Sequence, residues 1–163
     1  MITCKFEDGQ EACLRHVTVG AILLNQKRDR VLMVRRAENL LEAGKLGFPG
    51  GYLDRNESVT EGLLRETMEE TGHEGIIISI FRINDSITIS NDGGRQCVDI
   101  IFLVECGKKV ADFDHETAEL VWVDLNNLPT ADKVAFDHLD SLILFNKYRA
   151  KKTPLPIVGK ISL

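Results

Sequence analysis

The sequence predicts a sandwich of the α/β or α+β class, built around a mixed β-sheet. Apolar segments typical of strands are interspersed with two helical patterns, without the regular strand–helix–strand alternation of a fully parallel sheet. The chain has 163 residues, 44% hydrophobic and 28% charged, which is an ordinary globular balance. We therefore expect one domain over residues 1–163.

The first predicted elements form a β-hairpin. Residues 14–25 are rich in apolar and β-branched side chains, residues 26–29 form a polar turn, and residues 30–35 provide the returning strand. A loop follows over residues 37–47. It leads into a sharp turn at residues 48–51, where one proline and two glycines allow backbone angles that other residues avoid.

A helix is predicted over residues 58–71, because its apolar residues recur at helical spacing. Ser58 or Asn56 can cap its start, and Glu61 follows Ser58 by three residues, as a capping box requires. Gly72 stands where a helix often ends in a left-handed residue.

The second half of the sequence contains three predicted strands, residues 76–83, 96–106 and 120–123, and one amphipathic helix, residues 131–148. The polar stretch 91–94 joins the first two of these strands. Residues 149–163 form a basic tail with two prolines, expected to pack on the body or on a partner chain.

The sequence also suggests a position for three ring side chains. His16 lies within a strand pattern and is expected to be structural, and Trp122 is expected to lie in the core. His138 lies on the late helix and is expected at the surface. The four cysteines are expected to be reduced thiols, because the sequence contains no C-x-x-C pair of the kind that zinc sites usually have.

Charge and composition exclude several classes of protein. The net charge of −5 argues against binding a long nucleic acid, although small phosphorylated substrates remain possible. There is no run of 18 apolar residues, so no membrane span is expected, and the N-terminus lacks a signal-peptide layout. We therefore expect a cytoplasmic protein.

The most informative feature is a triplet of carboxylates, Glu66, Glu69 and Glu70. Their i, i+3, i+4 spacing places all three on one face of the predicted helix, where like charges repel. A hard divalent cation with oxygen ligands, typically Mg²⁺ where phosphates are handled, would offset that repulsion. Taken alone, the triplet is also compatible with a solvated acidic face or with compensation by Arg65.

The residues around the triplet resemble the Nudix box. The fixed glycine and polar positions of the box are all present at the family's spacing: Gly51, Glu57, Arg65, Glu66, Glu69, Glu70 and Gly72. Two positions depart from it, because Thr67 and His73 stand where the family prefers aliphatic residues. Both are packing positions, so we expect the helix to pack less tightly on the rest of the fold while the metal site stays intact.

This resemblance implies an α/β/α sandwich around a mixed sheet, with a loop–helix–loop metal site. In the family, the box glutamates hold Mg²⁺, for which Mn²⁺ can substitute, and a backbone carbonyl before the box adds a ligand. These ligands correspond to Glu66, Glu69, Glu70 and Gly50. The box arginine, here Arg65, orients the carboxylates with Glu57 as its partner, while Gly51 and Gly72 support the site.

The implied activity is hydrolysis of a pyrophosphate bond in a nucleoside diphosphate linked to another group, by attack of a metal-activated water on phosphorus. Nucleoside triphosphates, nucleotide sugars and ADP-ribose all remain open as substrates. The alternatives are a non-catalytic module that senses a nucleotide and a diphosphate isomerase. The resemblance also suggests a homodimer, which would bury the apolar tail segment 154–158.

Substrate and base residues are less sharply indicated. Either Arg35 or Arg36 can face a cleft and clamp a phosphate, since neighbouring strand residues point to opposite faces. Glu116, on a polar stretch before Trp122, is the predicted general base, with Glu69 as the alternative. Three nearby acids also remain possible bases: Asp112, Asp114 and Glu119.

Overall fold

The computed structural model describes residues 2–87 and 93–159. Two parts of the predicted elements lie outside the described residues: residues 91 and 92 of the polar stretch, and the last four residues of the tail. The elements in chain order are β1 (Ile2–Lys5), β2 (Glu11–Leu14), β3 (Val17–Leu24), β4 (Arg30–Arg36), β5 (Leu46–Gly47), β6 (Gly50–Tyr52), α1 (Val59–Thr71), β7 (His73–Asn84), β8 (Val98–Lys109), β9 (Thr117–Asp124), η1 (Ala131–Lys133), α2 (His138–Ala150) and β10 (Ile157–Val158).

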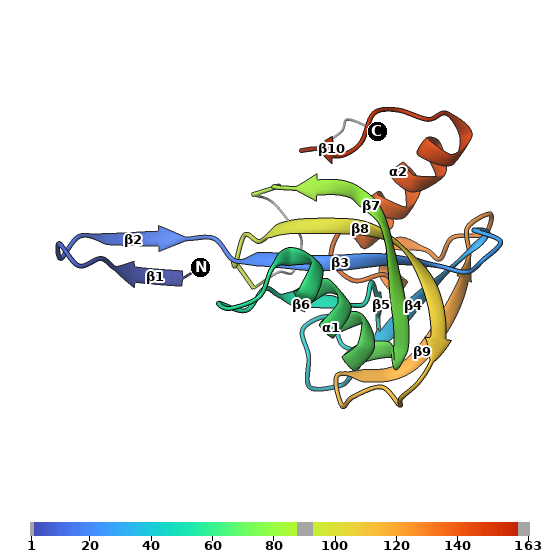
Figure 1. Cartoon of the computed structure of the whole chain (residues 1–163), viewed down its shortest axis with the longest axis horizontal. Helices are drawn as coiled ribbons and strands as arrows, with labels where there is room; N and C mark the ends of the chain where they lie inside the picture. Colours follow the sequence, from blue (N-terminus) through green and yellow to red (C-terminus); the bar gives the residue numbers. More distant parts are fainter. Residues whose placement is uncertain (1, 88–92, 160–163) are drawn as a thin grey trace.

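The centre of the molecule is an eight-stranded mixed sheet (Figure 1). Its main path runs in the order β10-β7-β8-β3-β4-β5, while β6 pairs with β3 and β9 pairs with β4. The pairs β3–β8 and β10–β7 are parallel and the other pairs are antiparallel. The mixed sheet predicted from the sequence is therefore confirmed.

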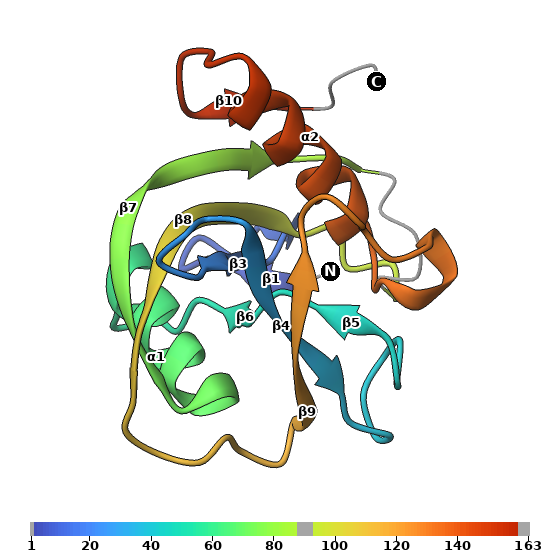
Figure 2. The ribbon, with the colours of Figure 1, turned by 90° about the vertical axis from the view of Figure 1, so that its right-hand side faces the viewer.

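The two α-helices cover opposite faces of this sheet (Figure 2). Alternate residues of β3 divide between two cores, because successive strand residues point to opposite faces. Val19 and Leu23 pack with Leu63 of α1, whereas Ile22 packs with Phe145 of α2. The α/β/α sandwich is confirmed.

Helix α1 begins and ends where local sequence signals place it. The Ser58 hydroxyl accepts from the Glu61 backbone N–H, and the Glu61 carboxylate accepts from the Ser58 N–H, which completes the predicted capping box. At the other end Gly72 adopts φ 69°, and a Cβ there would lie 2.1 Å from the Ala111 carbonyl oxygen. Both end signals are therefore confirmed.

The predicted helix over residues 131–148 is wrong in its first half. A short 3₁₀ turn, η1, is followed by a break at Phe136, which has φ 54°, and α2 starts only at His138. The Ala135 N–H donates to the Leu46 carbonyl, and Ala135 is fully buried. This segment therefore packs against β5, and tertiary contact overrides its helical pattern.

Three further predictions need correction. Strands β7, β8 and β9 extend beyond their predicted ends, because partner strands continue the ladder past the apolar residues. Trp122 is 41% exposed and does not lie in the core. His138 is not a surface residue: its ring stacks on Phe48 at 4.6 Å, and its Nδ1 accepts the Phe48 N–H at 2.9 Å. Burial lowers the pKa of His138 to about 4.

The two ends of the chain behave differently. The N-terminal β1–β2 hairpin, which the sequence patterns did not predict, projects from the body (Figure 1). In the tail, β10 pairs with β7, and Leu155 and Ile157 pack against the core. Pro154, Pro156 and Val158 of this segment stay exposed, so the homodimer stays a prediction. Among the described residues, no helix is long and apolar enough to cross a membrane.

Candidate active site

The predicted carboxylates lie where α1 meets the short strand β6. The two glycines of this strand allow the close approach. Gly50 has φ 154°, and a Cβ on it would lie 2.1 Å from the Val19 carbonyl oxygen. A Cβ on Gly51 would lie 2.5 Å from Glu66 Oε1. A side chain at Gly50 would therefore clash with β3, and one at Gly51 would clash with Glu66 of α1, so both glycines are required by packing.

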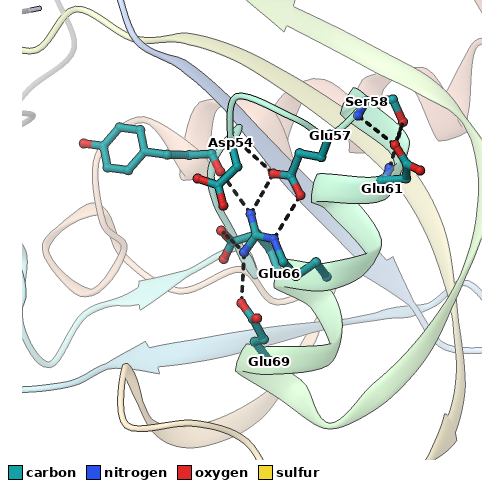
Figure 3. A network of polar contacts seen from close by, with 8 residues as sticks. Asp54, Glu57, Ser58, Glu61, Glu66 and Glu69 are labelled. Atoms are coloured by element: carbon teal, nitrogen blue, oxygen red, sulfur yellow. Dashed lines mark hydrogen bonds and ion pairs between the residues drawn. The ribbon is translucent and has the colours of Figure 1, made fainter.

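Arg65 donates hydrogen bonds to three glutamates, Glu57, Glu66 and Glu69, which are labelled in Figure 3. Its Nε and Nη2 donate to the two carboxylate oxygens of Glu57 at 3.0 and 2.8 Å. Its Nη1 donates to Glu66 and to Glu69, both at 2.9 Å, and Nη2 also reaches the Tyr52 carbonyl at 3.2 Å. The guanidinium thus holds three glutamates and one backbone oxygen, the bidentate geometry that arginine favours.

Glu57 is the firmest partner in this network. Hydrogen bonds from Arg65, and one from the Asp54 N–H, lower the pKa of Glu57 to about 2. The same contacts raise the pKa of Arg65. Glu57 therefore stays ionised and anchors the arginine, which is the orienting arrangement that the resemblance implied.

Glu70 is the most deeply placed carboxylate. It is 4% exposed, and the Gly50 N–H donates to its Oε2 at 2.9 Å. Burial raises the pKa of Glu70 to about 8, and burial also raises the pKa of Glu66. The helix thus carries two carboxylates whose ionised forms are poorly solvated, and the charge of Glu66 makes Glu70 harder to ionise.

These donors fit a hard divalent cation in their chemistry, because carboxylate and backbone oxygens are what Mg²⁺ and Mn²⁺ prefer. Within residues 2–87 and 93–159, however, no three acidic, histidine or cysteine side chains converge as a ready metal site. Glu66 and Glu69 instead turn to Arg65, which supplies the positive charge in this arrangement.

A loop from β8 to β9 is tied to the C-terminal end of α1. The Asp114 N–H donates to the Glu69 carbonyl, and the Thr117 hydroxyl donates to the Glu70 carbonyl. These bonds bring Glu116 into electrostatic range of Glu66 and Arg36. The structure therefore places the predicted base beside the carboxylate cluster.

The other acids of this stretch are engaged elsewhere. Asp112 pairs with Lys109 at 3.2 Å, and its side chain is 97% exposed. The Asp114 carboxylate accepts the Glu116 N–H, and Glu119 pairs with Arg35 at 2.7 Å. Asp112 and Glu119 thus belong to ion pairs, whereas Asp114 and Glu116 belong to none among the described residues, and the Asp114 carboxylate already accepts a backbone N–H.

The two candidate arginines differ in their surroundings. Arg35 is held by Glu119 and by the Gly44 carbonyl, away from the helix. Arg36 lies over the Phe136 ring at 5.1 Å, and the charges of Glu70 and Glu116 act on its pKa. Burial lowers the pKa of Arg36, while the charges of Glu70 and Glu116 raise it. An irregularity of the strand lies between Arg35 and Arg36, and the phosphate-clamp role of either residue stays a prediction.

Several polar and aromatic groups near the site were not singled out by the sequence patterns. The Tyr52 ring lies 5.0 Å from His16 and 5.8 Å from the Arg95 guanidinium, and its carbonyl is bound to Arg65. On the α2 face of the sheet, Asp99 accepts from Thr18 at 3.1 Å. These groups come from distant segments, and no local spacing signals that they meet.

The departure at Thr67 has a visible consequence. Thr67 is fully buried, and its hydroxyl has no hydrogen-bond partner among the described residues, where the family's aliphatic side chain would need none. The departure at His73 costs less, because the ring Nδ1 lies 2.9 Å from the Thr71 carbonyl. Neither residue touches the carboxylate network.

Comparison with known proteins gives a consistent result. Residues 14–144 match the family model described as NUDIX domain. The ADP-ribose pyrophosphatase of Methanocaldococcus jannaschii is 32% identical over 125 residues, covering 76% of this chain and 69% of that protein. The 8-oxo-dGDP phosphatase NUDT18 of Danio rerio is 32% identical over 110 residues, covering 65% of this chain and 31% of that protein.

The same fold occurs among solved structures. A NUDIX hydrolase from Nitrosomonas europaea superposes with a TM-score of 0.73 at 20% identity, covering 98% of this chain and 93% of that chain. At this identity the likeness concerns the fold. It extends over 98% of this chain.

Proposed function

This chain belongs to the Nudix hydrolase family and is a pyrophosphohydrolase, and on that premise we propose that it is a Mg²⁺-dependent enzyme that cleaves ADP-ribose. Water adds to one phosphorus and the bond to the bridging oxygen breaks. The products are AMP and ribose 5-phosphate, and two protons are released when both monophosphates are fully ionised.

The observation that carries this proposal is the crowding of carboxylates around one cation. Glu57, Glu66 and Glu69 share Arg65, while Glu70 is buried with only a backbone N–H as its partner. Such a surplus of buried negative charge destabilises a fold unless a cation accompanies it. A divalent ion would supply positive charge to the phosphate oxygens as well.

The protein's own residues would then bind and orient. Glu66, Glu69, Glu70 and the Gly50 carbonyl are the proposed metal ligands, and Arg65 with Glu57 sets the direction of the carboxylates. When a cation takes Glu66 and Glu69, Arg65 keeps its two bonds to Glu57, so its position does not depend on them. Preorganised positioning is the main contribution that a phosphoryl-transfer site makes.

Arg36 is the proposed phosphate clamp. Its guanidinium faces the carboxylates from β4, and its Nε is held by the Leu41 carbonyl at 2.7 Å. Its remaining N–H groups can reach a phosphate that a metal also touches. The Tyr52 ring, 41% exposed and connected to the site through Arg65, offers a surface on which an adenine can stack.

Glu116 is the proposed general base. It lies on a loop that two hydrogen bonds tie to α1, and it is separate from the proposed metal ligands. A carboxylate that does not ligate a metal is a better proton acceptor than one that does. Its placement near Glu66 supports a role in taking the proton of the attacking water.

The test is hydrolysis of a substrate panel followed by chromatography of the products. ADP-ribose, a UDP-sugar, a nucleoside triphosphate and 8-oxo-dGDP should be compared with Mg²⁺, with Mn²⁺ and with excess chelator. We expect AMP from ADP-ribose at the highest kcat/KM, none in chelator, and recovery when Mg²⁺ is restored.

The panel also separates the alternatives. Preference for 8-oxo-dGDP, on which one relative acts by its name, would overturn the substrate and keep the mechanism. Binding without turnover of any compound would identify a nucleotide sensor. Turnover that survives in chelator would contradict the metal site, and conversion of an isopentenyl diphosphate without release of phosphate would identify an isomerase.

A further inference from the structure

A second pocket lies apart from the carboxylates, on the α1 face of the sheet. Its volume is about 520 Å³, within the range of small-molecule sites. Its walls come from the β3–β4 turn, the start of β7, the end of β8, and Trp122 on β9. It shares no residue with the network around Arg65, so the proposed hydrolysis does not account for it.

The aromatic wall of this pocket is exposed without an apparent structural reason. Trp122 lies across from Leu32 in the β4–β9 ladder, yet 41% of its surface is accessible whereas Leu32 is buried. An indole left open on a pocket wall is a surface on which a planar ring can stack.

The turn beside Trp122 carries positive charge in a chain whose net charge is −5. Lys27 and Arg30 both line the pocket, and neither belongs to an ion pair among the described residues. Arg28, on the same turn, is outside the pocket lining and pairs with Glu105 at 3.7 Å. The two cations at the pocket are therefore available to an anion.

The one acid in the pocket lining offsets only part of this positive charge. The Asp29 carboxylate accepts the Asn25 side-chain N–H at 2.7 Å, and the Asn25 side-chain oxygen accepts the backbone N–H groups of Asp29 and Arg30. Hydrogen bonding by Asn25, together with the charges of Lys27 and Arg30, lowers the pKa of Asp29, and two cations against one carboxylate leave the lining positive. The hydrogen bonds with Asn25 hold the turn in shape, so its conformation does not depend on the cationic side chains.

We propose that this pocket is a second, non-catalytic site for a nucleoside monophosphate, with the base stacked on Trp122 and the phosphate bound by Lys27 and Arg30. The juxtaposition of an open aromatic face and two available cations at a pocket of this size matches a ligand that is planar at one end and anionic at the other. His73, at the start of β7, connects this pocket directly to the C-terminal cap of α1.

The test uses Trp122 as its own reporter, because it is the single tryptophan of the chain. AMP is titrated into the full-length protein in excess chelator, which removes metal-assisted binding at the carboxylates, and indole fluorescence is followed. We expect a saturable change. Adenosine alone and inorganic phosphate alone should each bind at least about tenfold more weakly, because each makes part of the contacts.

Variants of the turn distinguish this site from the catalytic one. Lys27→Ala and Arg30→Ala should each weaken AMP binding by about tenfold, whereas Arg28→Ala, the matched control, should leave it within about twofold. Glu70→Gln should not alter the titration. Absence of a saturable change in the unaltered protein would overturn the proposal, as would equal effects of Arg28→Ala and Arg30→Ala, or loss of the signal in Glu70→Gln.

Discussion

The two helices cover opposite faces of one sheet, and the buried charged side chain beneath each helix has different neighbours. Glu70 on the α1 side and Arg82 on the α2 side are both 4% exposed. Glu70 has one backbone donor, and the like charges of Glu66 and Asp114 act on it against the single opposite charge of Arg36. Arg82 donates to Ser141 and to Asn84, and Asn84 in turn donates to Asp137.

This difference indicates what each group is for. The Arg82 charge has two neutral hydrogen-bond acceptors and acts on the nearby acid Asp99, although its Nε has no partner among the described residues. These contacts offset part of its desolvation cost and serve the fold. A buried charge with like-charged neighbours destabilises the fold electrostatically. Such a charge is typical of a functional site, where a bound cation would remove the repulsion. Substitutions on the two sides should therefore affect different measurements.

The largest expected effect is that of Glu70→Gln. The amide keeps the shape and still accepts the Gly50 N–H, but it removes a negative charge from the proposed metal site. Turnover should fall by about 10²- to 10³-fold. The metal-free variant should unfold at the same temperature as the parent or higher, because a poorly solvated carboxylate is gone. Retained turnover would refute the assignment of Glu70.

Arg82→Met should show the opposite pattern. The guanidinium bonds to Ser141 and Asn84 are lost, and the nearby acids lose their cation, which should lower the free energy of unfolding by about 3 kcal/mol. Urea denaturation measures this. At a temperature where the variant remains folded, kcat should stay within about threefold. A large loss of kcat with unchanged stability would mean that the α2 side takes part in the chemistry.

The next effect tests the loop beside α1. Glu116→Gln should reduce kcat by about tenfold or more, with only a modest change in Mg²⁺ affinity, because a base is lost while the proposed ligands remain. Asp112→Asn and Asp114→Asn serve as controls from the same stretch and should each change kcat by less. Equal, small effects of all three substitutions would return the base role to Glu69.

The smallest effect concerns pH and the α2 side. Burial raises the pKa of Asp99 from 3.8 to about 6, so its ionisation opposes folding. The contribution of Asp99 to the free energy of unfolding is fully present below pH 3.8 and is lost as the pH rises to about 6. The loss is about 1–2 kcal/mol, because Asp99 is partly exposed and solvent weakens the effect. Asp99→Asn should therefore gain stability relative to the parent between pH 4 and pH 7, measured by urea denaturation. A constant difference across that range would contradict the shift.

The parts of the site that lie in one continuous segment were predictable from the sequence. Ser58, Glu61 and Gly72 set the ends of α1 through bonds that span a few residues, so their spacing contains the information. The same holds for Glu66, Glu69 and Glu70, because helical periodicity places them on one face whatever the helix packs against. Their proximity to Arg65 follows from the same periodicity.

The remaining features depend on contacts between distant segments. Residues 131–137 have a helical pattern, yet Ala135 binds the Leu46 carbonyl across the fold and the helix starts later. Strand alternation left Arg35 and Arg36 equivalent, whereas the fold pairs Arg35 with Glu119 and places Arg36 over the Phe136 ring. Local propensity is worth tenths of a kcal/mol per residue, so a few tertiary contacts outweigh it.

The sequence by itself thus determined the family, the mixed α/β class, the ends of α1 and the acidic face of that helix, because each depends on spacing along one segment. Only the tertiary structure decided that Glu116 lies beside that face, that His138 is buried against Phe48, and that Trp122 opens onto a second pocket. Those outcomes depend on which strands pair and which loops meet, and side chains more than about forty residues apart carry no local signal of their proximity.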